Sequence, residues 1–166
     1  MSHFDSLTAI ASNTRDFLET VWPDWQIEKA KRFGTSLPSV MSYSTCARSS
    51  TFLQRVMEEL GVAAEVRHGW FRTDASEEPA PRHSWVASGP WYIDVTADQF
   101  GAEEILVIEE ADNRYQSDID VAFPEFQLLR LQAVSEIWDR WTRSPMREKL
   151  VADLNALRVE SDCVQG

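Results

Sequence analysis

The feature that most constrains this fold is the stretch from residue 46 to residue 95, in which one amphipathic helix precedes several short strands. Apolar side chains follow Cys46 at the i, i+3, i+4, i+7 spacing of a helix: Leu53, Val56, Met57 and Leu60. Gly61 is expected to end this helix, because glycine adopts the left-handed conformation of a helix C-terminus without strain. A helix with one apolar side needs a second layer to cover it, so the sequence predicts an α+β fold with an antiparallel sheet packed on this helix.

Strands are expected in four segments after this helix: 62–71, 83–87, 91–95 and 104–109. Residues 87–90 separate the second segment from the third and are typical of a hairpin turn. The length of that turn decides where two polar side chains point. With two or four residues in the turn, His83 and Asp94 lie on the same face of the sheet, whereas three residues without a bulge place them on opposite faces.

Two helices are expected before this core. Apolar residues recur with a helical period over 5–20, and the pattern is interrupted at Pro23, which lacks the N–H that a helix interior needs. A second helix is therefore expected from Asp24 to about Phe33, ended by Gly34.

Two more helices are expected after the core, over 124–143 and 145–157, each beginning with a proline at a tolerated first-turn position. An apolar stripe in the first of them is interpreted as core packing, with a partner-binding groove as the alternative; its members are Phe126, Leu129, Leu131, Val134, Ile137, Trp138 and Trp141. The chain is expected to form a single domain over 1–166, with a core at 46–110, N-terminal helices at 5–34 and C-terminal helices at 124–158.

Charge and composition exclude some classes of partner. The 166 residues carry 27 acidic and 16 basic side chains, a net charge of −11. Nucleic acid and anionic membrane surfaces are therefore not expected as partners, because both would repel the protein. No secretory signal and no apolar run of about 20 residues is visible, so a cytoplasmic location is expected. Two cysteines make a poor disulfide framework and are expected to be reduced.

Three residues have the types and the order of a thiol catalytic triad: Cys46 at a helix start, His83 at a strand start and Asp94 in the next strand. A thiol titrates near 8.5, but an adjacent imidazolium and the positive end of a helix lower its pKa to roughly 3.5–7.5. The histidine then carries a proton to the leaving group, and the carboxylate orients the imidazole. Thr45 or Ser44 is expected to cap the helix and to place the sulfur in its first turn.

Each of these residues also has a plain structural interpretation. A cysteine at a helix start is often a small buried apolar residue, and a histidine in a strand is often a structural one. Asp94, followed by Thr96 and Asp98, is compatible with simple turn chemistry. The joint occurrence of the three residues favours the catalytic interpretation.

The same segments resemble a known family. The helix from Cys46 to Gly61, the strand His83-Ser-Trp-Val86 and the strand Trp91-Tyr-Ile-Asp94 are similar to the transglutaminase-like core of the papain-like cysteine enzymes. The resemblance covers about residues 46–100 and extends to the leader peptidases of lasso-peptide biosynthesis. It implies a papain-like fold in which the helix begins at the catalytic cysteine, with Cys46 as nucleophile, His83 as base and acid, and Asp94 as the residue that orients His83.

Two features depart from the family pattern. The glycine and tryptophan that often flank the cysteine of transglutaminases are absent, which leaves the second donor of the oxyanion hole unassigned. Gln99 follows the aspartate motif, and the family pattern gives it no role.

The resemblance implies acyl transfer or hydrolysis at an amide of a peptide or protein substrate, as in a peptidase, deamidase or transglutaminase. No cofactor or metal is expected, because three scattered histidines and two distant cysteines lack ligand spacing. A catalytically silent protein-binding module with a tryptophan-rich cleft is the alternative, since the chain has seven tryptophans.

Two further features lie near the expected cleft. His68 is compatible with a position lining the cleft, and a structural role is the alternative. The loop 73–82 carries Asp74, Glu77 and Glu78, so it is expected to overhang the site and to favour basic or neutral substrates. An exposed solvated connection is the alternative for this loop.

Overall fold

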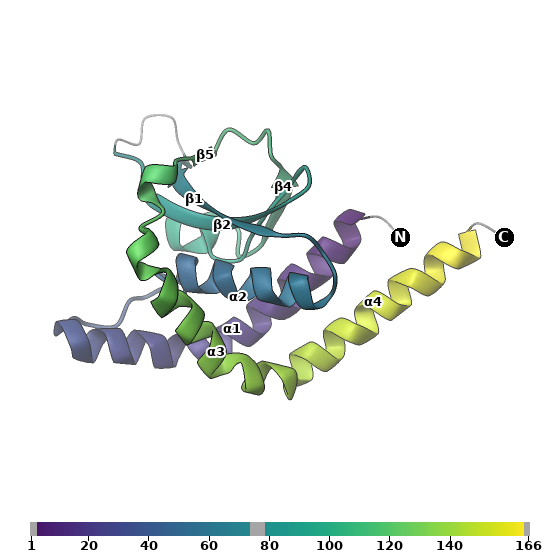
Figure 1. Cartoon of the computed structure of the whole chain (residues 1–166), viewed down its shortest axis with the longest axis horizontal. Coiled ribbons are helices and arrows are strands. Elements are labelled where there is room, and N and C mark those ends of the chain that lie inside the picture. Colours follow the sequence, from purple (N-terminus) through teal and green to yellow (C-terminus); the bar gives the residue numbers. More distant parts are fainter. Residues whose placement is uncertain (1–2, 74–78, 165–166) are drawn as a thin grey trace.

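The computed structural model describes residues 3–73 and 79–164 and shows an antiparallel sheet packed on helices, which confirms the α+β class (Figure 1). The α-helices are α1 (His3–Phe33), α2 (Cys46–Glu59), α3 (Gln127–Thr142) and α4 (Pro145–Val164). The strands are β1 (Glu65–Phe71), β2 (Arg82–Ser88), β3 (Trp91–Asp94), β4 (Leu106–Glu109) and β5 (Tyr115–Ser117). Short 3₁₀ turns are η1 (Ala97–Phe100), η2 (Ile119–Val121) and η3 (Pro124–Phe126). The acidic residues Asp74, Glu77 and Glu78 lie outside the described residues.

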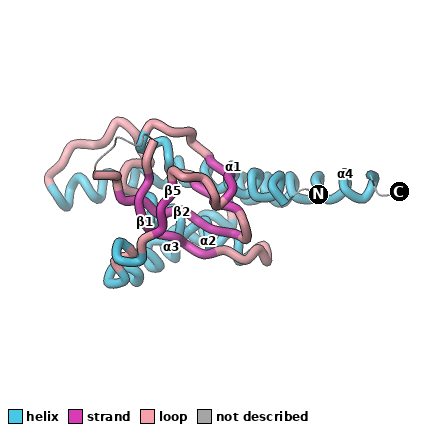
Figure 2. The backbone as a smooth tube through the Cα atoms, turned by 90° about the horizontal axis from the view of Figure 1, so that it is seen from above, coloured by secondary structure: helices cyan, strands magenta, loops and turns pink. Residues whose placement is uncertain are grey.

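The five strands are ordered β4-β3-β2-β1-β5, and all neighbours are antiparallel. The four predicted strands are confirmed with shifted ends, whereas β5 was not predicted. Figure 2 shows both chain termini at the same end of the molecule, where α1 and α4 extend beyond the sheet. No helix within residues 3–73 and 79–164 is long and apolar enough to cross a bilayer.

The N-terminal part corrects a prediction, because one continuous helix replaces the expected two. Pro23 lies inside α1 on its exposed side, and the buried side continues past it through Trp22 and Trp25. Water can therefore solvate the carbonyl that a proline leaves without a helical donor, while tertiary packing keeps the helix continuous through the position. Gly34 follows the helix with φ 64, as expected for a left-handed stop.

The main core lies between the sheet and the helices. Leu53, Val56 and Met57 of α2 are fully buried, which confirms the predicted core side of this helix. Phe52 from the same helix contacts Phe17 of α1 and Trp141 of α3, with ring centroids 5.3 and 5.6 Å apart. These contacts hold α2 between the other helices and the sheet, and so fix the position of its first residue, Cys46.

The first part of the predicted stripe in α3 is not core. Val134, Ile137 and Trp141 are buried, but Phe126, Leu129 and Leu131 are 46–51% exposed. Phe126 and Leu129 face a hollow shared with α1, and Leu131 faces another along α2. Periodicity shows which side of a helix is apolar, whereas the neighbouring elements decide how much of that side is covered.

The edge strand β5 depends on a close approach at Gly69 of β1. Gly69 pairs with Ser117, and a Cβ on Gly69 would lie 1.9 Å from the carbonyl oxygen of Gln116. Gly69→Ala is expected to lower the free energy of unfolding by roughly 2–4 kcal/mol, because the strand must move away to admit the methyl group. Urea unfolding measures this, and Ser117→Ala serves as the control because it changes an exposed side chain only. Equal stability of the two variants would contradict the close approach.

Candidate active site

A tight hairpin places His83 and Asp94 on the same face of the sheet. Ala87 pairs with Tyr92 and Ser88 with Trp91, so the turn between β2 and β3 consists of two residues, Gly89 and Pro90. Gly89 has φ 54, and proline cannot have positive φ, which matches a type II′ turn. The same register sets Asp94 opposite Trp85, two residues beyond His83, so the pair meets diagonally.

His83 and Asp94 form a buried hydrogen-bonded pair. Nε2 of His83 lies 2.6 Å from Oδ2 of Asp94, and the two residues are 2% and 1% exposed. The same Oδ2 accepts a hydrogen bond of 2.8 Å from the hydroxyl of Tyr115 in β5. Oδ1 accepts from the backbone N–H of Thr96 at 2.9 Å and from its hydroxyl at 3.2 Å. Asp94 thus accepts hydrogen bonds within the turn that follows it, as its structural interpretation expected, and also contacts the imidazole of His83.

Cys46 lies close to the imidazole of His83 and lines the same pocket. The buried Nδ1 of His83 forms no hydrogen bond of standard geometry among the described residues, while Cys46 and His83 are close enough that each shifts the pKa of the other. The backbone of Ser84 also contacts the Cys46 sulfur. The structure therefore brings the three residues of the expected triad together in the order Cys46, His83, Asp94.

The electrostatics favour a charged pair. Burial alone would raise the pKa of Cys46, but His83 nearby and the backbone of Ser84 together lower it below its ordinary value. Burial opposes the charge on His83 as well, yet Asp94 and Cys46 raise the pKa of His83 to about 10. Burial likewise opposes ionisation of Asp94, and His83, Thr96 and Tyr115 together lower its pKa. Together these shifts favour the charged pair, a thiolate beside an imidazolium, over the neutral thiol and imidazole.

The helix start differs from the predicted cap. Thr45 is the residue before α2, but its side chain caps no backbone N–H. Its hydroxyl donates to the carbonyl of Ser42 at 2.7 Å and accepts from the hydroxyl of Ser49 at 3.1 Å. The Thr45 hydroxyl therefore joins the loop before α2 to Ser49 instead of capping a backbone N–H of the helix.

Gln99 holds the backbone just before Cys46. Its side-chain oxygen accepts from the backbone N–H of Ser44 at 3.1 Å, and its Nε2 donates to the carbonyl of Thr96 at 2.9 Å. Ser44 has φ 61, a left-handed conformation that costs energy outside glycine and needs such support. Gln99 thus ties the loop before the cysteine to the turn after Asp94, which accounts for the glutamine that the family pattern left unexplained.

A buried ionic network supports the same loop. Arg15 of α1 donates to both carboxylate oxygens of Asp98 at 2.9 Å and to the carbonyl of Val95 at 2.9 Å. The hydroxyl of Ser42 donates to Asp98 at 2.7 Å. Sequence reasoning missed Arg15, because nothing local indicates that a helix residue so far along the chain contacts the segment after Asp94.

The Cys46 sulfur lies in a pocket between α2, the sheet and the start of α3. The pocket is lined by Tyr43, Ser44, Cys46, Ala47, His68, Pro81, Arg82, His83, Ser84, Gln99, Phe100, Val121, Phe123 and Arg130. His68 lines it, as one of its two interpretations expected, and its Nδ1 lies 2.7 Å from the hydroxyl of Ser84. Burial and nearby Arg130 lower the pKa of His68 to about 4, so His68 is neutral at pH 7. Tyr115 and Arg130 are site residues that the sequence did not indicate.

No group of three or more His, Cys, Asp or Glu side chains in the described part of the chain is arranged to hold a metal ion. No family model matches this chain, and neither does any curated protein or solved structure. Its function must therefore be inferred from the chemistry of its own residues.

Proposed function

We propose that this protein is a cysteine-dependent enzyme that transfers or hydrolyses acyl groups at an amide of a peptide or protein. The observation that carries the proposal is the arrangement of Cys46 beside the buried pair His83–Asp94: Nε2 of His83 lies 2.6 Å from Asp94, and its Nδ1 has no other partner among the described residues. The order of the elements supports a transglutaminase-like variant of the papain-like fold, since α2 begins at the cysteine while consecutive strands carry the histidine and the aspartate.

In the proposed reaction the Cys46 thiolate attacks the amide carbonyl carbon and forms a C–S bond. His83 donates the proton from its Nδ1 to the departing nitrogen, the C–N bond breaks, and a thioester remains. Water or an amine then attacks the thioester while His83 takes up its proton, and the thiolate leaves. The backbone N–H of Cys46, in the first turn of α2, is one donor suited to the developing oxyanion. Asp94 stabilises the imidazolium throughout.

The alternative, a silent binding module with a tryptophan-rich cleft, has less support. Trp22, Trp85 and Trp141 are fully buried, and none of the seven tryptophans is among the residues that line the Cys46 pocket. Trp22, Trp85 and Trp141 contribute to core packing instead. A silent module also has no use for a buried imidazolium beside a thiol, which costs desolvation energy.

The test is incubation with a mixed peptide library, followed by mass spectrometry. The proposal expects new peptide termini, conversion of amides to acids, or exchange with an added amine, and these three results separate peptidase, deamidase and transglutaminase. Protein alkylated beforehand with iodoacetamide is the control. Absence of all three conversions, or conversions that survive alkylation, would refute the thiol mechanism.

Tyr115 is expected to act as a positioning residue within this mechanism. Tyr115→Phe removes one of the two donors on Oδ2 of Asp94, so the carboxylate holds His83 less well, and kcat is expected to fall about tenfold with a small change in KM. Tyr92→Phe is the control, because Tyr92 packs against Tyr115 in the same aromatic cluster and has no contact with Asp94 among the described hydrogen bonds. Steady-state kinetics on any converted peptide measures both. Equal kcat in the two variants would remove Tyr115 from the mechanism.

A further inference from the structure

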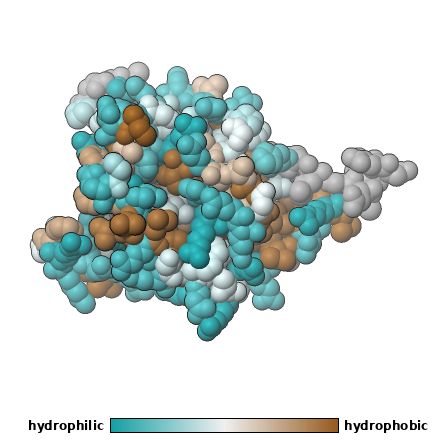
Figure 3. All heavy atoms as spheres, viewed as in Figure 1, coloured by the Kyte–Doolittle hydropathy of each residue, from teal (hydrophilic) through white to brown (hydrophobic). Residues whose placement is uncertain are grey.

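A second hollow lies beside the Cys46 pocket, and the two share Ser44. We call it the α1–α3 groove; its walls come from the end of α1, the start of α2, and the segment around η3 and the start of α3. Its apolar lining includes Trp25, Phe126 and Leu129. Figure 3 shows apolar side chains gathered over the N-terminal part of α3, and Leu128 there is 78% exposed. An exposed apolar strip next to a reactive thiol has the placement of a substrate subsite.

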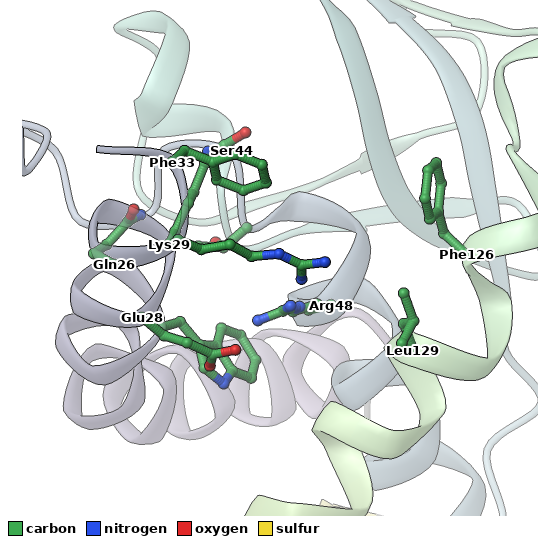
Figure 4. Close-up of a pocket in the computed structure, with 11 residues that line it drawn as sticks. Gln26, Glu28, Lys29, Phe33, Ser44, Arg48, Phe126 and Leu129 are labelled. Atoms are coloured by element: carbon green, nitrogen blue, oxygen red, sulfur yellow. The ribbon is translucent and has the colours of Figure 1, made fainter. Parts of the chain in front are cut away.

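The groove is basic although the protein is acidic. Lys29, Arg32 and Arg48 line it, with Glu28 as the one acidic residue among the described lining. None of the three cations forms an ion pair among the described residues; the Lys29 ammonium lies 5.4 Å from the Tyr43 ring centroid. Figure 4 shows Arg48 pointing into the space between α1 and α3, with Phe126 and Leu129 on the facing wall. In a chain of net charge −11, this is a local reversal of sign.

The positive charge of the α1–α3 groove continues into the Cys46 pocket. Arg82 and Arg130 line that pocket, and no described lining residue is acidic. Arg130 is 8% exposed, and its Nη1 donates to the carbonyl of Ala122 at 2.9 Å. Burial lowers the pKa of Arg130, and no carboxylate lies within ion-pair distance of it among the described residues. A buried guanidinium that faces a cavity without a carboxylate partner is suited to an anionic group of a ligand.

We propose that the substrate of this site is an acidic peptide segment with apolar side chains. A carboxylate close to the reacting amide binds Arg130 in the Cys46 pocket. The adjoining residues lie in the α1–α3 groove, where apolar side chains contact Trp25, Phe126 and Leu129 and a further carboxylate meets Lys29 and Arg48. This proposal rests on the proposed function and names its substrate class. It differs from the expectation of basic or neutral substrates, which depended on acidic residues outside the described part.

Binding tests the groove separately from catalysis. Fluorescence anisotropy with the Cys46→Ala protein compares labelled peptides that differ only by Glu in place of Gln. The Glu peptide is expected to bind at least about tenfold more tightly at low salt, and added salt is expected to reduce the difference. The double variant K29Q/R48Q is expected to lose most of this difference in affinity between the Glu and Gln peptides. Arg143→Gln is the matched control, since Arg143 is an exposed cation beyond the other end of α3, and it is expected to change binding less than twofold.

Kinetics tests the Arg130 subsite. Arg130→Gln is expected to abolish the preference in kcat/KM for Glu over Gln near the reacting amide, whereas Arg130→Lys keeps part of it because the charge remains. Melting temperatures show whether either Arg130 variant is unfolded. If one is, peptide binding by the groove variant K29Q/R48Q still tests the substrate class. Equal binding of Glu and Gln peptides, or tighter binding of Lys peptides, would overturn the substrate class even if the enzyme converts peptides through Cys46. Tight binding of acidic peptides with no Cys46-dependent conversion would support the groove and overturn the reaction.

Discussion

Replacing Cys46 by alanine is expected to abolish peptide conversion, with a loss of about 10³-fold or more, while the protein remains folded. The sulfur is the nucleophile that lines the pocket beside the His83–Asp94 pair, and alanine fits the half-buried position. The measurement is the turnover of any peptide found in the library screen, with circular dichroism as the check on folding.

The matched control is Cys163→Ala, which removes the second cysteine of the sequence and is expected to retain full activity. This comparison separates loss of the site from loss of a thiol in general. Residual turnover above a few per cent of wild type in folded Cys46→Ala protein would exclude a covalent role for this sulfur.

Replacing His83 by alanine is expected to slow alkylation of Cys46 by iodoacetamide at about pH 6 by tenfold or more. In the wild type, the lowered pKa of Cys46 keeps the thiolate as pH falls below the range of an ordinary thiol, and His83 loses its proton only as pH rises through about 10. Without the imidazolium, burial dominates and the pKa of Cys46 rises, so almost all of the sulfur is thiol near pH 6.

The difference between the two proteins is expected to shrink in alkaline solution, where both hold a thiolate. Peptide mapping by mass spectrometry assigns the label to Cys46 or Cys163, and His3→Ala, an exposed change at the start of α1, is the control. If wild type and His83→Ala label Cys46 at the same rate near pH 6, the two side chains do not form the charged pair.

Local pattern determined the parts of the fold that depend on near neighbours in sequence. The i, i+3, i+4, i+7 spacing after Cys46 predicted α2 and its buried side, and Gly61 adopts the left-handed stop with φ 74. The strand segments and the turn signal at 87–90 predicted β2 and β3, but whether His83 and Asp94 share a face was left open until the structure showed the two-residue turn Gly89-Pro90. Their meeting required only a two-residue turn and the pleat of the sheet.

Tertiary structure decided what depends on distant partners. Local pattern predicted a break at Pro23, but burial of Trp22 and Trp25 on the other side keeps α1 continuous. The three-residue strand β5 is too short to show a period, and it forms because Gly69 lets its backbone approach β1. Tyr115 reaches Asp94 only because of that pairing.

The surroundings of the candidate site follow the same division. The sequence by itself determined the types and order of the three central residues, because each sits at the start or within a periodic element. Only the tertiary structure decided that Arg15 braces the turn after Asp94 and that Arg130 enters the Cys46 pocket. The physical reason is that hydrophobic periodicity reports which side of an element is apolar, whereas contacts across the chain depend on how the packed elements are finally placed.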